Sequence, residues 1–303
     1  MQTRRIALKI DVDTLRGTLE WVPRLLEVLR RHEAGASFYF SLGPDHTGRA
    51  LKRVFRRGFL GKVRRTSVLE HYGLRTLLYG TLLPGPRIDV KGGAVMRTVR
   101  DAGFEVGVHC YDHVRWQDGV ASADAAWTRR EFVRALESFE GVFGTVPKAH
   151  AAAGWQLNAQ VLELEREFAL DYASDARGST PFWPTMGGVQ GRCLQLPTTL
   201  PTFDELIGVA GMDADGAAAQ ILTLSRTGAT DTHVFTLHAE LEGQKLLPQF
   251  EGLLRGWREA GLGLGSMLEY RRGIEDTAVP RHELVWGSVA GRSGTLAAQG
   301  RPT

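Results

Sequence analysis

Short apolar runs alternate with amphipathic segments along most of this chain, and this alternation limits the fold more than any other feature of the sequence. Runs with the composition of buried strands lie at residues 5–12, 36–42, 104–110, 146–153, 170–174, 193–196, 233–238 and 262–265. Segments with helical spacing of apolar residues lie at 18–32, 92–102, 127–139, 159–168, 217–225 and 246–260. Alternating strands and helices are typical of a parallel sheet with helices packed outside it. About seven such units predict an α/β fold, a distorted or incomplete (β/α) barrel, with polar site residues at the carboxyl ends of the strands.

The composition fits a folded protein of this kind. The chain has 303 residues, of which 43% are hydrophobic and 23% are charged, so it can bury a core and is not expected to be disordered. Its two cysteines, Cys110 and Cys193, are too few for a disulfide framework and fit a reducing compartment. The sequence has no signal-peptide pattern and no apolar run of the roughly 20 residues that a spanning helix needs. We therefore expect the protein to face the cytoplasm.

Polar side chains close three of the predicted strands. Asp11 and Asp13 end the first strand, His109 and His113 follow the strand that starts at residue 104, and His238 ends the strand 233–238. Taken one at a time, each feature has an ordinary explanation: a helix cap, a surface histidine pair or a structural histidine. Because the carboxyl ends of parallel strands meet at one edge, we expect these side chains to lie close together.

This combination predicts a hydrolase with a metal ion. Asp13, His109 and His113 offer one carboxylate and two imidazoles, which suit one divalent ion such as zinc, cobalt or manganese and leave a position open for water. Asp11 is the candidate general base, and His238 is the candidate acid that protonates the leaving group.

The same residues resemble the motifs of the polysaccharide-deacetylase superfamily, which includes rhizobial chitooligosaccharide deacetylases and peptidoglycan deacetylases. Asp11 and Asp13 match its first motif, His109 and His113 its second, and the Leu-His pair ending at His238 its last. The resemblance implies a deacetylase-type barrel, here a single catalytic domain over 1–303, that hydrolyses amides with a divalent ion.

A closer resemblance is to the bacterial deformylases that act on formamido-arabinose linked to phosphoundecaprenol. It rests on six segments, at 9–18, 41–45, 151–155, 174–178, 200–205 and 238–243. It implies hydrolysis of the formamide to formate and a free amine, on a polyprenyl-phosphate-linked sugar at the cytoplasmic face of the inner membrane. That reaction belongs to lipid A modification with aminoarabinose and to polymyxin resistance. The alternatives are a deacetylase of N-acetylated cell-wall sugar and a non-catalytic, membrane-associated binding protein on the same scaffold.

The third motif departs from the family pattern. Related deacetylases carry an arginine there that pairs with the base, whereas residues 149–155 contain none. Arg177 and His150 are the two candidates to replace it in space. The rim residues Trp155, Asp175, Arg177 and Glu240 are expected to bind the sugar, the phosphate or the new ammonium, or else to pair with one another.

One basic segment stands out from an otherwise acidic chain. Residues 46–75 hold nine Lys or Arg and one Glu, a net charge of +8, so the remaining chain carries −5 of the total of +3. From residue 51 the apolar residues recur at helical spacing, which predicts a basic amphipathic helix at a membrane surface. We assign the insertion, at about 46–90, to an anionic membrane surface rather than to nucleic acid, because no nucleic-acid motif accompanies it. The residues predicted to bind the membrane are Arg53, Arg56, Arg57, Arg64 and Arg65.

Overall fold

The main sheet is parallel, and β1 lies inside it. A computed structural model describes residues 4–50, 74–227 and 231–303. The strand order is β5-β4-β3-β2-β1-β8, and β9 also pairs with β1. All of these pairs are parallel, so the strands end at one edge. The bounds are β1 Arg5–Val12, β2 Ser37–Ser41, β3 Glu105–Cys110, β4 Ala149–His150, β5 Tyr172–Ala173, β8 Thr232–His238 and β9 Gly263–Gly265.

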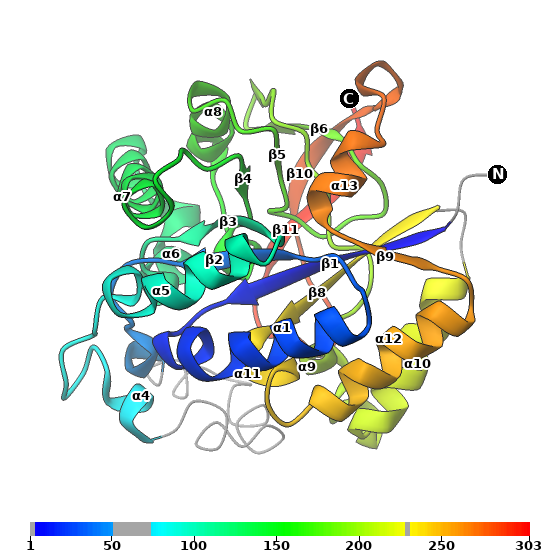
Figure 1. Ribbon diagram of the computed structural model, residues 1–303. Helices are drawn as coiled ribbons and strands as arrows, with labels where there is room; N and C mark the ends of the chain where they lie inside the picture. Colours follow the sequence, from blue (N-terminus) through cyan, green and yellow to red (C-terminus); the bar gives the residue numbers. More distant parts are fainter. Residues whose placement is uncertain (1–3, 51–73, 228–230) are drawn as a thin grey trace.

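Helices surround this curved sheet, as Figure 1 shows, and together they form a half-barrel. The longer helices are α1 Val22–Arg31, α5 Ile88–Asp101, α7 Ala125–Phe143, α8 Ala159–Glu167, α10 Ala214–Arg226 and α12 Leu247–Glu259. The shorter ones are α4 Leu74–Leu78, α6 His113–Gly119, α9 Phe203–Leu206, α11 Ala239–Glu242 and α13 Met267–Arg272. A π-helical turn at Gly17–Trp21 precedes α1. The prediction of an incomplete (β/α) barrel is confirmed.

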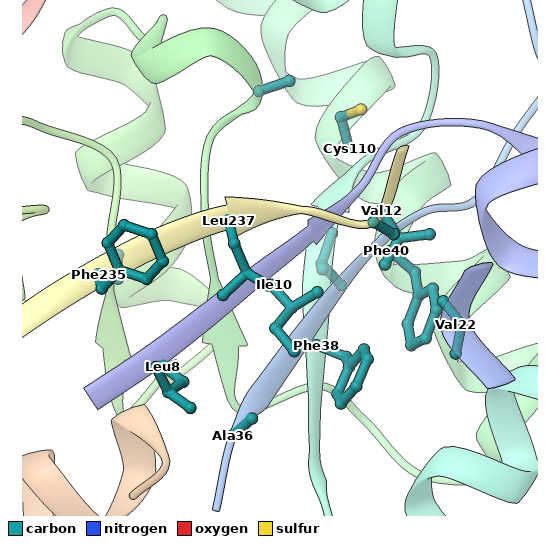
Figure 2. Close-up of a cluster of buried hydrophobic side chains, with 14 of the residues drawn as sticks. Leu8, Ile10, Val12, Val22, Ala36, Phe38, Phe40, Cys110, Phe235 and Leu237 are labelled. Atoms are coloured by element: carbon teal, nitrogen blue, oxygen red, sulfur yellow. The ribbon is translucent and has the colours of Figure 1, made fainter. Parts of the chain in front are cut away.

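Residues of β1 alternate between two buried faces. Leu8, Ile10 and Val12 lie in the main hydrophobic core, among side chains of β2 and β8 (Figure 2). Burying each such side chain contributes about 1.5–3 kcal/mol. Because successive side chains of a strand point to opposite faces, Lys9 and Asp11 lie on the other face of β1. Asp11, on this second face, is one of the residues of the candidate site.

Residues 183–190 and the C-terminal residues 281–302 form a second sheet that the sequence pattern did not predict. Its order is β11-β10-β6-β7, from β6 Trp183–Met186, β7 Val189–Gln190, β10 Arg281–Gly287 and β11 Leu296–Pro302. The strand predicted at 193–196 is wrong: Gln195 makes only isolated bridges, to Ala173 and Phe182.

Most of the predicted membrane segment lies outside the described residues. This holds for the five arginines predicted to bind the membrane: Arg53, Arg56, Arg57, Arg64 and Arg65. Among the helices in the described ranges, none combines the length and the apolarity needed to cross a bilayer.

Candidate active site

Three strands bring the predicted catalytic side chains to one edge of the sheet. β1 carries Asp11 and leads into Asp13, β3 carries His109, and β8 ends at His238. Asp11 and His238 are direct neighbours in the register between β1 and β8. His113 is the first residue of α6, which follows β3. All five side chains therefore gather where the sequence placed them.

Asp13 and the two histidines form a compact set of possible ligands. The Nε2 atoms of His109 and His113 each lie 3.3 Å from the same Oδ1 atom of Asp13. Ligand atoms that surround one tetrahedral ion at about 2.0–2.1 Å stand roughly 3.3–3.4 Å apart, so the observed spacing suits a shared ion. The Asp13 Oδ1 atom is buried and accepts no hydrogen bond from the described residues. One carboxylate and two imidazoles fit zinc, cobalt or manganese.

The charge state of Asp13 also suits a cation. Burial alone would raise the pKa of Asp13, but His113 and His109 beside it hold that pKa well below its usual range. Asp13 therefore remains a carboxylate at neutral pH, which is the form that binds a metal ion.

A second cluster of acids and a histidine lies deeper. His150 Nδ1 is 3.1 Å from both Glu165 Oε1 and Asp175 Oδ1, and all three side chains are buried. Asp175 also accepts hydrogen bonds from the backbone N–H of Ala152 and from Gln195, at 2.7 and 2.9 Å. Burial, and Asp175 next to it, raise the pKa of Glu165 well above its usual value. We interpret this cluster as a core network that joins β4, α8 and the segment after β5.

Lys9 is the cation beside Asp11. Its Nζ atom lies 3.4 Å from Asp11 Oδ2 and donates a 3.1 Å hydrogen bond to the carbonyl oxygen of Ser174. The side chain is fully buried, and its ammonium lies 5.1 Å from the centre of the Trp155 ring. Burial lowers the pKa of Lys9, whereas the charges of Asp11 and Asp175 raise it. Although the third motif holds no arginine, a cation therefore faces Asp11 from the strand that carries it.

This placement corrects the two candidates named from the sequence. Arg177 pairs through Nη2 with Glu205 at 3.2 Å, and His150 faces the two acids of the buried network. The sequence did contain evidence that Lys9 faces Asp11, because residues two apart on a strand point to the same face. A lysine in a buried apolar run, two positions before Asp11, therefore has to face the same way as Asp11.

His238 is anchored through its backbone. Its N–H donates a 2.9 Å hydrogen bond to Glu242 Oε2, which fixes the end of β8. Its Nδ1 atom is buried and has no hydrogen-bond partner within the described part of the chain. Burial raises the pKa of Glu242 to about 8, although the N–H of His238 opposes that rise.

Glu240 holds the loop that carries Asp13. Its Oε1 atom accepts hydrogen bonds from the backbone N–H groups of Asp13 and Thr14, at 3.1 and 2.9 Å, and from the Thr14 hydroxyl at 2.8 Å. A Cβ atom on Gly17 would lie 2.1 Å from the same oxygen, so the close approach needs glycine. The contact with Glu240 therefore accounts for the glycine at position 17 in the segment 9–18, one of the six segments that carry the closer resemblance.

The other predicted rim residues contact the protein itself. Trp155 is only 1% exposed, and the guanidinium groups of Arg177 and Arg292 lie 5.5 and 4.4 Å from its ring centre. Arg292 comes from the C-terminal part of the chain that the sequence pattern did not explain. Direct substrate contact by Trp155, Arg177, Asp175 and Glu240 remains a prediction.

Comparison with known proteins extends over nearly the whole chain. Residues 2–173 match the family described as polysaccharide deacetylase. A protein of Shewanella sediminis, assigned as the 4-deoxy-4-formamido-L-arabinose-phosphoundecaprenol deformylase ArnD, is 36% identical over 295 residues, which cover 97% of this chain and 94% of the relative. A protein of Wigglesworthia glossinidia brevipalpis with the same assignment is 30% identical over 291 residues, covering 93% and 98%.

Solved structures show the same fold at low sequence identity. A protein of Mycobacterium smegmatis assigned to the polysaccharide deacetylases matches with a TM-score of 0.60 at 17% identity, covering 95% of this chain and 96% of that one. A family 4 carbohydrate-esterase pseudoenzyme of Bacillus anthracis matches with a TM-score of 0.51 at 14% identity, covering 89% and 66%. Since the fold also occurs in a pseudoenzyme, the residues at the rim have to carry the functional argument. The chain belongs to the polysaccharide deacetylase family and is a hydrolase of amide carbon–nitrogen bonds.

Proposed function

We propose that this protein is a metal-dependent deformylase that acts on 4-deoxy-4-formamido-L-arabinose linked to undecaprenyl phosphate. The observation that carries the proposal is the convergence of His109 and His113 on one oxygen of Asp13, with Asp11 and His238 side by side on adjoining strands. The two relatives assigned to this reaction, similar over nearly their whole length, support the choice of substrate. The product would be the aminoarabinose lipid used for lipid A modification and polymyxin resistance.

Asp13, His109 and His113 are the residues that would hold the ion. A bound divalent ion polarises a carbonyl group and makes water a stronger nucleophile at neutral pH. The chain supplies these ligands from the end of β1, from β3 and from the start of α6, so their spacing depends on the sheet rather than on a flexible loop.

Asp11 acts as the general base on the attacking water. Its Oδ2 atom faces Lys9, whereas its Oδ1 atom accepts no hydrogen bond from the described residues and lies 3.9 Å from His109 Nδ1. Oδ1 is therefore available to take the proton of a water molecule that attacks the formyl carbon. A base in such a position contributes roughly 10²–10⁴-fold to the rate.

His238 acts as the acid on the leaving nitrogen. Its position as the direct neighbour of Asp11 in the register between β1 and β8 supports a shared role of the two groups at one reacting centre. As the carbon–nitrogen bond breaks, His238 gives a proton to the sugar nitrogen and water supplies the hydroxyl group to the formyl carbon. The products are formate and the free amine.

The protein would work at the cytoplasmic face of the bacterial inner membrane as a peripheral enzyme. Its substrate is anchored by a polyprenyl chain, and moving that chain into water would be costly. Each Lys or Arg near an anionic leaflet contributes about 1 kcal/mol, and residues 46–75 carry a net charge of +8. Docking through this segment would bring the enzyme to the sugar.

The direct test is turnover of a matched pair of substrates. Formamido-arabinose polyprenyl phosphate and its acetamido analogue are each incubated with the protein and a divalent ion, and products are followed by mass spectrometry. We expect the formamide to be cleaved much faster than the acetamide, with Asp13→Ala as the inactive control. Equal rates would favour a general deacetylase, and no turnover of either substrate by metal-loaded protein would favour a non-catalytic binding protein.

A further inference from the structure

Lys9 is held rigidly beside the general base. Its ammonium donates a hydrogen bond to the carbonyl of Ser174 and lies 5.1 and 6.0 Å from the ring centres of Trp155 and Tyr39. The side chain is 0% exposed. Because these groups enclose the ammonium, it cannot swing away from Asp11, which lies 3.4 Å from it.

The described cations around Asp11 are otherwise engaged. Arg177 pairs with Glu205, and His150 with the buried acids. An isolated buried carboxylate costs the folded state several kcal/mol, and the side chain of Asp11 is only 4% exposed. The His109 imidazole also lies 3.9 Å from Asp11 Oδ1, but its Nε2 atom faces Asp13 as a candidate metal ligand. Lys9 is therefore the cation that faces Asp11 Oδ2 within the described part of the chain.

We propose that Lys9 is the positioning residue of the general base and takes the place of the third-motif arginine of related deacetylases. It holds Oδ2 of Asp11 so that Oδ1 faces the reacting water on the side of His109. This inference rests on the proposed role of Asp11 as the base. Lys9 and Asp11 come from one strand, two residues apart, so the pair needs no third-motif side chain.

The competing explanation is that Lys9 only stabilises the fold. Both explanations predict lower activity when Lys9 is replaced, so a single variant does not separate them. A double-mutant cycle does, because two residues that act through one group give losses that do not add. The cycle uses Lys9→Gln, Asp11→Asn and the double variant. Glutamine can still donate to the Ser174 carbonyl but carries no charge.

We expect Lys9→Gln to lower kcat by roughly 10²-fold with KM changed less than about 3-fold, because the loss cannot exceed what Asp11 itself contributes. The double variant should be at most about 3-fold slower than Asp11→Asn. Lys9→Arg should have an activity within about 10-fold of that of the parent. Metal content by elemental analysis should stay at the parental value in every variant. An additive double variant, or Lys9→Arg no better than Lys9→Gln, would overturn the proposal.

Arg177→Gln is the matched control. Arg177 also lies over the Trp155 ring, at 5.5 Å, but pairs with Glu205 instead of Asp11, so its losses should add to those of Asp11→Asn. If Lys9→Gln does not fold, Lys9→Met, which retains the length of the side chain, completes the same cycle. The cycle is run on whichever amide the parent cleaves. The test therefore still applies if the formamido-sugar is not the substrate. An additive cycle would argue against the role of Lys9 but would not affect the substrate assignment.

Discussion

Replacing Glu242 with glutamine should change how the stability of this protein depends on pH. The side chain is fully buried, its Oε2 atom accepts the N–H of His238 at 2.9 Å, and its Oε1 atom has no hydrogen-bond partner among the described residues. Burial raises its pKa to about 8 from an ordinary value of 4.5. Glutamine is close in shape to the protonated side chain and can still accept the same hydrogen bond, but it cannot ionise.

The sign and size of the effect follow from proton linkage. A carboxyl group whose pKa is raised on folding binds its proton more tightly in the folded state, so its contribution to stability falls as pH rises from about 4.5 to about 8. One pKa unit corresponds to about 1.4 kcal/mol, so ionisation of Glu242 costs the folded protein on the order of 5 kcal/mol. The variant avoids this cost. Its free energy of unfolding, relative to that of the parent, should therefore rise by a few kcal/mol between about pH 5 and pH 8.5.

The assay is urea unfolding of both proteins, kept metal-free by a chelator, across that pH range. The remaining buried acids are common to both proteins, so their effects cancel when the free energy of unfolding of the parent is subtracted from that of the variant. Glu167→Gln is the control: hydrogen bonds from Arg129 hold the pKa of exposed Glu167 below its usual value, so the difference in stability between this variant and the parent should change with pH only below about 4.5 and stay constant between pH 5 and 8.5. Parallel stability curves for the parent and Glu242→Gln between pH 5 and 8.5 would refute the reasoning.

Three further predictions concern the site and the membrane. His113→Ala and Asp13→Ala should each lose the ion and nearly all turnover; full metal content in both variants by elemental analysis would contradict the ligand assignment. Asp11→Asn and His238→Ala should keep the ion and lose roughly 10²–10⁴-fold in kcat, and near-normal turnover of Asp11→Asn would mean that another group is the base. Binding to anionic vesicles should weaken with added salt, and unchanged co-sedimentation after charge reversal would show that the segment does not dock the protein. That last test replaces five residues with Glu: Arg53, Arg56, Arg57, Arg64 and Arg65.

The long buried strands and the rim residues were predictable because their pattern is local. β1 and β8 are mostly apolar strands with Asp11 and His238 near their carboxyl ends, and neighbouring parallel strands end at one edge. The strands predicted at 146–153 and 170–174 shrink to Ala149–His150 and Tyr172–Ala173. Their length depends on where a neighbouring strand offers hydrogen bonds, and no local pattern carries that information.

Lys9 and the C-terminal sheet were missed for a different physical reason. A lysine inside an apolar strand is stable there only because Asp11, Ser174 and Trp155 surround it, and two of these three lie far away in the sequence. The residues after Trp286 are rich in glycine and weakly patterned. Their hairpin depends on pairing of β10 with β6, which is again a distant partner.

The pairing of the first strand with a strand near the end of the chain has a consequence for biosynthesis. The Asp13 loop is held by Glu240, which lies 227 residues later. Ribosomes add about 5–20 residues per second, so β1 leaves the ribosome roughly 10–45 s before the residues that complete its surroundings. During that interval β1 is an apolar strand without its neighbour β8, the kind of segment that chaperones protect. We therefore expect the ligand set to form only after translation is nearly complete, so that metal loading follows synthesis of the chain.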